Sequence, residues 1–190
     1  MINEALRAIR LTIVFAVVTG LVYSLALTGA IQVVFPSQAN GSLVTKDGQV
    51  VGSQLIGQQF TSDKYFHGRF SATSYAADNS AGSNLGPNNK ALVDRAASSA
   101  RTVRQENGLG PNDPVPVDLV TADFSGIDPD ISEAAALLQV DRVARVRGLD
   151  PARVRDLVEK HVQGRILWIF GEPHVNVLEV NMALDAGEAG

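Results

Sequence analysis

The sequence predicts an α+β protein with a single N-terminal transmembrane helix followed by one extracytoplasmic domain, which contains two hairpins and about three helices. Three observations lead to this prediction: a long uncharged apolar run near the N-terminus, a tight-turn dipeptide between two extended runs, and helical patterns with caps at both ends. The order strand, helix, helix, helix, strand is typical of α+β folds and not of repeating βαβ units. The chain has 190 residues, which suits one ordinary domain after the helix.

The apolar run covers residues 11–35, and no charged residue occurs between Leu11 and Thr45. A bilayer crossing needs about 20 apolar residues, so this run is long enough to span. At about 1.5 Å per residue it also exceeds a hydrocarbon core of about 30 Å, which predicts tilt or an end that emerges near Gln32. We therefore predict a transmembrane helix at 11–35 and a short N-terminal segment at 1–10.

The charges around the apolar run predict its orientation. Arg7 and Arg10 precede it, whereas the first charges after it, Lys46 and Asp47, cancel. The positive-inside rule then places residues 1–10 in the cytoplasm and the main domain outside. A cleaved signal peptide is the alternative, with a small-residue site at 28–30, but the apolar run is longer than the usual 7 to 15 residues and continues beyond that site.

A linker at 36–42 is predicted to join the helix to a domain at 43–184. Pro36 cannot continue the helix, and Asn40-Gly41 is a turn pair. The domain opens with a hairpin of residues 43–45 and 49–56, because Asp47-Gly48 supplies the positive φ angles of a tight turn.

Three capped helices follow along the chain. The first begins at Asn88 or Asn89 and stops at Gly108; the second begins at Ser132 and closes at Gly148; the third begins at Asp150-Pro151 and runs to about Val162. The proline-rich stretch before the second helix is predicted to be largely irregular. The inward residues of the second helix are expected to be Ala136, Val140, Val143 and Val146, and those of the third helix Val154, Leu157 and Val158.

A second hairpin is predicted near the C-terminus. The segments RILWIF (165–170) and HVNVLEVNMAL (174–184) have the alternation and β-branched content of strands, and Gly171-Glu172-Pro173 joins them. Residues 185–190 are predicted to be a frayed tail.

No familiar catalytic or metal-binding motif is found. The chain has no P-loop, and the stretch around Ser83 departs from a nucleophile elbow at Leu85. His67, His161 and His174 are not spaced as ligands on one helix, so no metal site is expected. The absence of cysteine excludes disulfides and thiolate sites, and the net charge of −4 gives no basic field for nucleic acid. The aromatic stretch 65–75 around Arg69 is either a partner contact or part of the core.

Six segments, taken in chain order, resemble the C subunit of the Kdp potassium-transporting ATPase. They are GSQLIGQQF (52–60), YFHGRFSA (65–72), GSNLGPNN (82–89), DLVTADFSGIDPDIS (118–132), QVDRVARVRGL (139–149) and GEPHVNVLEVNMAL (171–184). With the N-terminal helix they cover nearly the whole chain. The sequence departs from the family pattern at Phe70, at Asp123-Phe124 and at Asp130, where the family usually has Pro, Ser-Gly and His.

The resemblance implies a non-catalytic accessory subunit, with no catalytic residue of its own, in an ATP-driven, high-affinity potassium import complex of the bacterial inner membrane. Its implied partners are a channel-like potassium-binding subunit, an ATP-hydrolysing P-type subunit and a small single-helix subunit, together with the lipid bilayer. The family is described as a catalytic chaperone that raises the ATP affinity of the hydrolysing subunit. No cofactor is expected on this chain itself, since ATP acts at the level of the complex.

An outward-facing domain cannot touch a cytoplasmic nucleotide, so an external clamp over the ion entrance is the alternative to the ATP-affinity chaperone. A secreted hydrolase and a free-standing solute-binding or adhesive module are the alternatives outside the family. The candidate partner contacts are the polar residues Arg69, Asn84 and Asn88, together with Gly20 for close helix approach in the membrane, where it could equally be neutral. The turn-rich segment 80–89 is then expected to be an ordered external loop and not a phosphate cradle.

Overall fold

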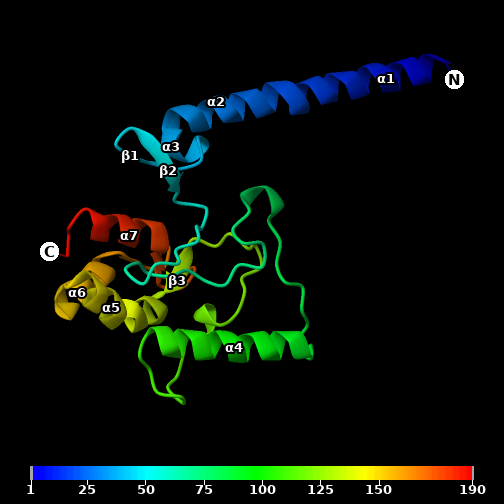
Figure 1. Ribbon diagram of the computed structural model, residues 1–190. Coiled ribbons are helices and arrows are strands. Elements are labelled where there is room, and N and C mark those ends of the chain that lie inside the picture. The colour runs from blue at the N-terminus through cyan, green and yellow to red at the C-terminus, as the bar shows by residue number, and fades with distance from the viewer. Residues whose placement is uncertain (1, 190) are drawn as a thin grey trace. The chain divides into compact units, whose positions relative to one another are not determined.

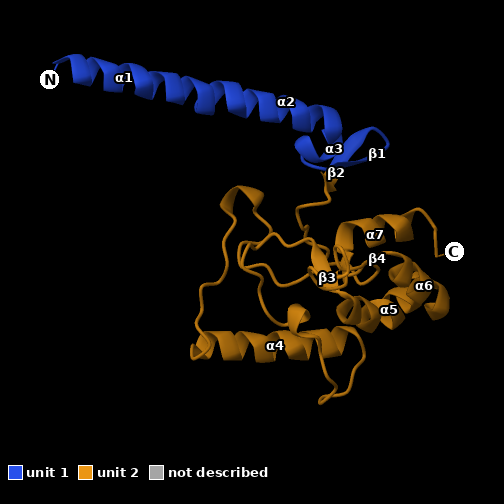
Figure 2. Ribbon diagram, turned by 180° about the vertical axis from the view of Figure 1, so that it is seen from behind, with its two compact units in different colours: residues 1–51 blue, residues 52–190 orange. Residues whose placement is uncertain are grey.

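The computed structural model describes residues 2–189. The chain divides into two compact units, residues 1–51 and residues 52–190, which are coloured separately in Figure 2. The first unit holds the apolar helix and a hairpin. The second unit holds the remaining helices, a small sheet and several long loops (Figure 1).

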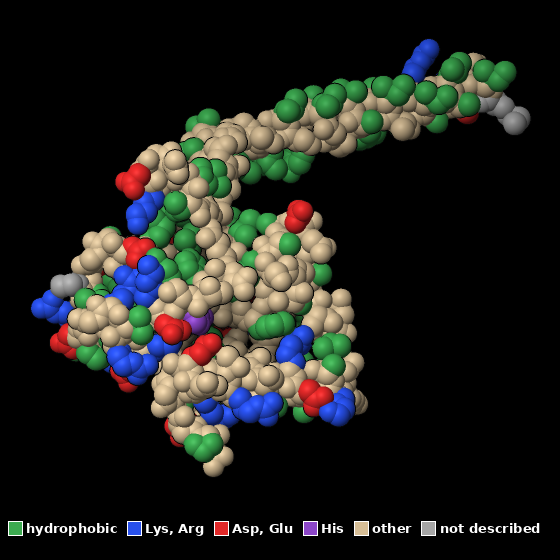
Figure 3. Space-filling view, in the orientation of Figure 1, with side chains coloured by type: hydrophobic (Ala, Val, Ile, Leu, Met, Phe, Trp, Pro, Cys, Tyr) green, Lys and Arg blue, Asp and Glu red, His purple; other side chains and the backbone are tan. Residues whose placement is uncertain are grey.

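Unit 1 begins with one continuous helical stretch. It consists of α1 (Ile2–Val17), a π-helical turn η1 (Val18–Tyr23) and α2 (Ser24–Val34), and no residue of the three segments is buried. Apolar side chains cover much of its visible surface (Figure 3). The stretch of 33 residues is long and apolar enough to cross a membrane. The helix begins at Ile2, before the predicted start at Leu11, because residues 2–10 are mostly good helix formers.

The end of unit 1 follows the predicted linker and hairpin closely. Pro36 occupies the first position of the short helix α3 (Pro36–Ala39), where its missing N–H costs nothing. Strands β1 (Leu43–Lys46) and β2 (Gln49–Ser53) then pair. Asp47 and Gly48 have φ angles of 52° and 77°, as a type I′ turn requires. The first hairpin is confirmed, with its second strand ending three residues before the predicted Ile56.

Unit 2 is organised around a three-stranded antiparallel sheet. Strand β5 (His174–Asn176) lies between β3 (Asp130–Ser132) and β4 (Val162–Gln163). Helices α5 (Glu133–Arg147), α6 (Pro151–Lys160) and α7 (Val177–Asp185) complete the core. Its fully or nearly fully buried members include Phe66, Ile131, Ala136, Val140, Val143, Val154, Leu157, Val158, Val175, Val180 and Leu184.

The three predicted helices are confirmed, together with their caps. Asn89 accepts a hydrogen bond from Ala91 N at the start of α4 (Lys90–Glu106), and Ser132 accepts one from Ala135 N at the start of α5. Asp150 caps α6, and Gly148 ends α5 with a φ of 67°. Two short 3₁₀ turns, η2 (Ala77–Asn79) and η3 (Val117–Leu119), lie in the irregular segments.

The predicted inward face of α5 is wrong at one position. Ala136, Val140 and Val143 are fully buried, but Val146 is 48% exposed. At about 100° per residue, Val146 lies roughly 80° around the helix from Ala136. It therefore falls outside the stripe that α6 and the sheet cover.

A second hairpin is present, since the consecutive strands β4 and β5 pair antiparallel, but the strands predicted for it are wrong. Residues 166–170 form a tight exposed loop with one bridge between Ile166 and Phe170, and not a strand. The segment 174–184 contains only the short strand β5 before α7 begins at Val177. The physical reason is a cap: Asn176 accepts a hydrogen bond from Glu179 N at 3.1 Å, which starts a helix where the valine alternation predicts a continued strand.

The segment after α7 is bonded to the end of that helix. Gly187 N donates to Leu184 O, and Glu188 N donates to Ala183 O. Gly187 has a φ of 82°, the left-handed conformation in which helices commonly end. Ala189 is 2% exposed. Residues 186–189, part of the segment for which fraying is predicted, thus lie against the domain in this structure.

Candidate functional site

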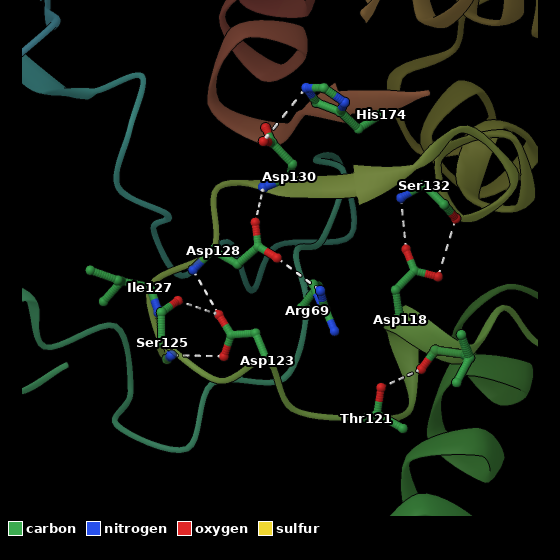
Figure 4. Close-up of polar contacts among 12 residues, drawn as sticks. Arg69, Asp118, Thr121, Asp123, Ser125, Ile127, Asp128, Asp130, Ser132 and His174 are labelled. Atoms are coloured by element: carbon green, nitrogen blue, oxygen red, sulfur yellow. Dashed lines mark hydrogen bonds and ion pairs between the residues drawn. The ribbon is translucent and has the colours of Figure 1, made fainter. Parts of the chain in front are cut away.

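Three loops of unit 2 meet at what we call the three-loop junction: residues 69–75, 80–83 and 123–128. Asp123, which is 8% exposed, organises the third loop. Its Oδ1 accepts a hydrogen bond from Gly126 N at 2.8 Å, and its Oδ2 accepts from Asp128 N at 2.8 Å and from Ser125 Oγ at 3.0 Å (Figure 4). A single carboxylate thus holds the loop in one conformation.

The other two loops are bonded to the third through hydroxyls and close backbone approach. Ser71 Oγ donates to Gly126 O at 2.5 Å, and Ser80 Oγ donates to Ser125 O at 2.9 Å. Gly126 has a φ of 72°, and a Cβ there would lie 2.3 Å from Thr73 Oγ1. No side chain fits at this position, so Gly126 fixes how closely the loops meet.

Arg69 is held at the junction by its own chain. Its Nη1 donates to Asp128 Oδ2 at 2.8 Å, and the two side chains are 25% and 27% exposed. Its carbonyl accepts a hydrogen bond from Tyr75 OH at 2.6 Å, while its buried Nε has no hydrogen-bond partner among residues 2–189. The arginine is therefore held in place by its own chain, with a quarter of its side chain still exposed.

A cavity of about 480 Å³ lies beside this arginine, within the size range of small-molecule and side-chain sites. One wall is α4, through Ser98, Ser99, Thr102 and Glu106, and the other is the segment 59–75. His67 Nδ1, on one wall, lies 3.5 Å from Glu106 Oε2, on the other. The hydroxyls, the imidazole and the guanidinium favour a polar occupant that accepts hydrogen bonds.

The segment that carries Arg69 is fixed from behind by buried amides. Asn181 accepts from Phe66 N at 2.8 Å and donates to Phe66 O at 3.0 Å. Gln139 pairs in the same way with the N–H and carbonyl of His67, at 2.8 Å and 3.1 Å. Both amides are almost fully buried. They replace the partner strand that this extended segment lacks, which satisfies its backbone groups.

Arg142 completes this buried network. It is 1% exposed and donates to Asn107 Oδ1 at 3.0 Å, to the carbonyls of Asp63 and Tyr65 at 2.6 and 2.9 Å, and to Gln139 Oε1 at 2.6 Å. Burial lowers the pKa of Arg142 from its ordinary value. Sequence reasoning missed Gln139 and Arg142, although both adjoin the predicted inward stripe of α5, which is the signal that could have revealed them.

Two other groups near the junction have shifted pKa values. Burial, reinforced by Asp123 and Asp128, raises the pKa of Tyr75 from 10.0 to about 12. Burial also raises the pKa of Asp130, and nearby His174 opposes that rise. Asp130 Oδ2 lies 3.9 Å from His174 Nε2 (Figure 4).

The shift at Tyr75 predicts a late tyrosine titration at high pH. Because the folded pKa lies above the unfolded value of 10.0, the folded protein keeps a proton that the unfolded chain has lost. The free energy of unfolding should therefore fall as pH rises from 10.0 to about 12. Absorbance titration of tyrosinate should show this late step in the wild type and not in Tyr75→Phe. A late step that persists in Tyr75→Phe would assign it to another tyrosine.

The structure places the four predicted contact residues in different surroundings. Asn84 is exposed with a φ of 52°, and Asn88 is exposed just before the cap Asn89. Gly20 lies in η1 of unit 1, and a Cβ there would meet nothing within 4 Å. Of the four residues, only Arg69 lies in the three-loop junction, and the segment that precedes Asn84 also reaches this junction. The roles of all four residues in partner contact stay predictions.

Phe70, for which a departure from the family pattern is predicted, also lies at this site. The guanidinium carbon of Arg95 lies 4.9 Å from the ring centroid of Phe70, a cation–π geometry. Arg95 Nη2 also donates to Ser83 Oγ at 3.2 Å. Arg95 thus connects α4 both to Phe70 and to the start of the 80–89 segment. Among residues 2–189, no group of three His, Cys, Asp or Glu side chains is arranged to hold a metal ion.

Comparison with known proteins gives matches over almost the whole chain. Residues 5–186 match the family described as the K+-transporting ATPase, c chain. The chain is 52% identical to the potassium-transporting ATPase KdpC subunit of Rhodopseudomonas palustris strain BisB18, with 99% of this chain and 100% of the relative aligned. It is 51% identical to the subunit of that name from Bradyrhizobium diazoefficiens, over 100% of both chains, and 52% identical to that from Methylobacterium nodulans, over 95% and 97%.

Proposed function

The chain belongs to the K+-transporting ATPase c-chain family, and from this membership we propose that it is a non-catalytic accessory subunit that stabilises an ATP-driven potassium import complex. The observation that carries the proposal is identity of about half of all positions over the full chain. The partners we propose are a channel-like potassium-binding subunit, a P-type ATP-hydrolysing subunit and a small single-helix subunit.

We further propose that residues 11–35 anchor the chain in the bacterial inner membrane in a single pass. The helical stretch 2–34 has the required length and composition, and its apolar side chains find no cover within unit 1. Arg7 and Arg10 favour a cytoplasmic N-terminus. The domain that follows then lies outside the membrane, on the extracytoplasmic side.

For the mechanism we propose an external clamp near the ion entrance. The three-loop junction supports this choice, because the 80–83 segment packs against the 123–128 loop: Ser80 Oγ donates to Ser125 O, and a Cβ on Gly82 would lie 3.0 Å from Phe124 O. Carbonyl oxygens at this close approach disfavour a phosphate at the same position. An effect on ATP affinity then has to reach the hydrolysing subunit as a coupling free energy through the complex. The chain itself is proposed to hold no cofactor.

The orientation distinguishes the clamp from a chaperone that contacts ATP directly. External protease added to intact spheroplasts should digest the domain after Ser37 and leave a protected N-terminal fragment. If that domain is protected in intact cells and is digested only after lysis, it faces the cytoplasm. The external clamp would then be excluded, and direct nucleotide contact by the segment 80–89 would become the better proposal.

Arg69→Ala is expected to reduce co-purification of the partner subunits from mild detergent, because the exposed part of the Arg69 side chain is proposed to contact a partner. Asp128→Ala is the matched control, since it removes the same internal ion pair but keeps the guanidinium. A larger loss of co-purified partner subunits in Arg69→Ala than in Asp128→Ala supports partner contact. An equal loss of co-purified subunits in the two variants would assign Arg69 to the internal ion pair alone. Potassium-limited growth gives a second readout in both variants.

A further inference from the structure

The loop of residues 166–170, which we call the apolar loop, exposes five large apolar side chains in succession. The exposed fractions are 71% for Ile166, 72% for Leu167, 90% for Trp168, 73% for Ile169 and 62% for Phe170. Monomeric soluble surfaces rarely expose so much contiguous apolar area. The loop therefore needs a cover that unit 2 does not supply.

The backbone of the apolar loop is closed on itself. Ile166 N and Phe170 N each donate to the other residue's carbonyl, at 2.9 and 3.0 Å, and Trp168 N and Ile169 N donate to Arg165 O and Ile166 O, both at 3.2 Å. Leu167 and Trp168 have φ angles of 52° and 60°, a left-handed conformation that is costly for large side chains. The loop thus keeps a strained turn that presents its side chains outward, while much of its backbone is already hydrogen-bonded.

We propose that the apolar loop inserts as a wedge into the interfacial region of the lipid bilayer in which its own chain is anchored. This inference rests on the membrane anchorage proposed above. Tryptophan beside aliphatic residues is the composition that interfacial segments favour. The internal hydrogen bonds matter here, since backbone groups that enter an apolar medium must be satisfied.

The charges flank the wedge and do not interrupt it. Arg165 Nη2 and Glu172 Oε2 form an ion pair of 2.7 Å at the base of the loop. This pair can remain at the level of the lipid headgroups while residues 166–170 enter the bilayer. A shallow insertion into the bilayer requires charged residues beside the inserted segment and apolar residues within it, and the loop has both.

The anchor keeps unit 2 within reach of the bilayer. Eighteen peptide steps separate the end of α2 at Val34 from Gly52, about 60 Å even when fully extended. Helix α3 and the hairpin shorten this path further. A domain of this size has a radius of gyration of roughly 14 Å, so the tether holds the apolar loop at a high effective concentration near lipid.

A lipid occupant explains the distribution of exposure better than a protein partner does. All five side chains of the loop are more than half exposed, and Trp168 is 90% exposed. A flat protein surface covers one face of such a turn, whereas lipid surrounds it on all sides. A protein partner stays an outcome of the experiment below.

Trp168 is the only tryptophan in the chain, so its fluorescence reports on this loop alone. The full-length chain is reconstituted in phosphatidylcholine–phosphatidylglycerol vesicles, with or without lipids brominated near the headgroup end of the acyl chains. We expect emission at shorter wavelength than for exposed tryptophan and a clear loss of intensity with brominated lipid. The matched control is the double variant Trp168→Phe, Phe124→Trp, because Phe124 is 98% exposed at another part of unit 2. The emission intensity of the tryptophan at position 124 in this variant should be the same with and without brominated lipid, apart from any general background quenching.

A second variant tests the insertion without moving the probe. Ile169→Ser with Phe170→Ser should remove the quenching of Trp168 while circular dichroism stays unchanged. If the wild-type chain floats with vesicles after an alkaline wash but Trp168 is not quenched, the wedge is overturned and the anchorage stands. If the emission of Trp168 moves to shorter wavelength only after partner subunits are added, a protein covers the loop and the lipid proposal is overturned. A chain that fails to float overturns both proposals.

Discussion

Arg142→Ala is expected to destabilise the protein by about 3–5 kcal/mol, the largest effect of any single substitution considered. Arg142 is 1% exposed, and its guanidinium satisfies acceptors at the C-cap of α4, on α5 and in the segment 63–65. Alanine would leave these acceptors buried without a donor and would also leave a cavity. Urea unfolding of the detergent-solubilised chain, followed by circular dichroism, measures the change.

Arg145→Ala is the matched control for this prediction. Arg145 lies one turn away on α5, but its side chain is exposed, so its loss should change the unfolding free energy by less than about 0.5 kcal/mol. Arg142→Lys should be intermediate, since an ammonium keeps the charge but cannot reproduce the planar fork of donors. Equal stability of Arg142→Ala and Arg145→Ala would contradict the bracing role of the buried guanidinium.

Asp123→Ala is expected to destabilise the protein by about 2–4 kcal/mol, because two backbone N–H groups and one hydroxyl lose a charged acceptor at once. The exposed Asp141 on α5 provides the control Asp141→Ala, for which little change is expected. Thermal unfolding of both variants measures the difference.

The same substitution should also loosen the three-loop junction locally. Asp123 contributes to the raised pKa of Tyr75, so the late tyrosine titration of Asp123→Ala should move to lower pH. Hydrogen exchange at the amides of Gly126 and Asp128 should become faster, since both donate to Asp123. Unchanged exchange at these two amides would show that the loop conformation does not depend on the carboxylate.

Local sequence signals predicted the elements that depend on a few neighbouring residues. The caps at Asn89, Ser132 and Asp150 begin helices where the sequence places them, because a cap bond forms within one turn. The Asp47-Gly48 turn likewise needs only its own positive φ angles. The strand predicted over 174–184 is wrong for an equally local reason. The Asn176 cap starts α7 within one turn, although the valine alternation predicts a strand there.

The candidate site was predictable only in part. Arg69 was identified from its aromatic surroundings, but its ion pair with Asp128, 59 positions away, depends on how two irregular loops close on each other. Gln139 and Asn181 were missed because their partners are backbone groups more than 70 positions away. A periodic pattern along the chain does not show that the Gln139 and Asn181 amides bond the backbone of residues 66 and 67 in place of a neighbouring strand.

The apolar helix, the helix caps, the first hairpin and the family can all be predicted from the amino-acid sequence, since each follows from composition, from contacts within a turn or from ordered motifs. Which polar side chains are buried, how Asp123 shapes the three-loop junction and the exposure of residues 166–170 depend instead on contacts between distant segments. These features depend on long-range packing, in which burial makes each unsatisfied polar group costly and so selects one arrangement of loops.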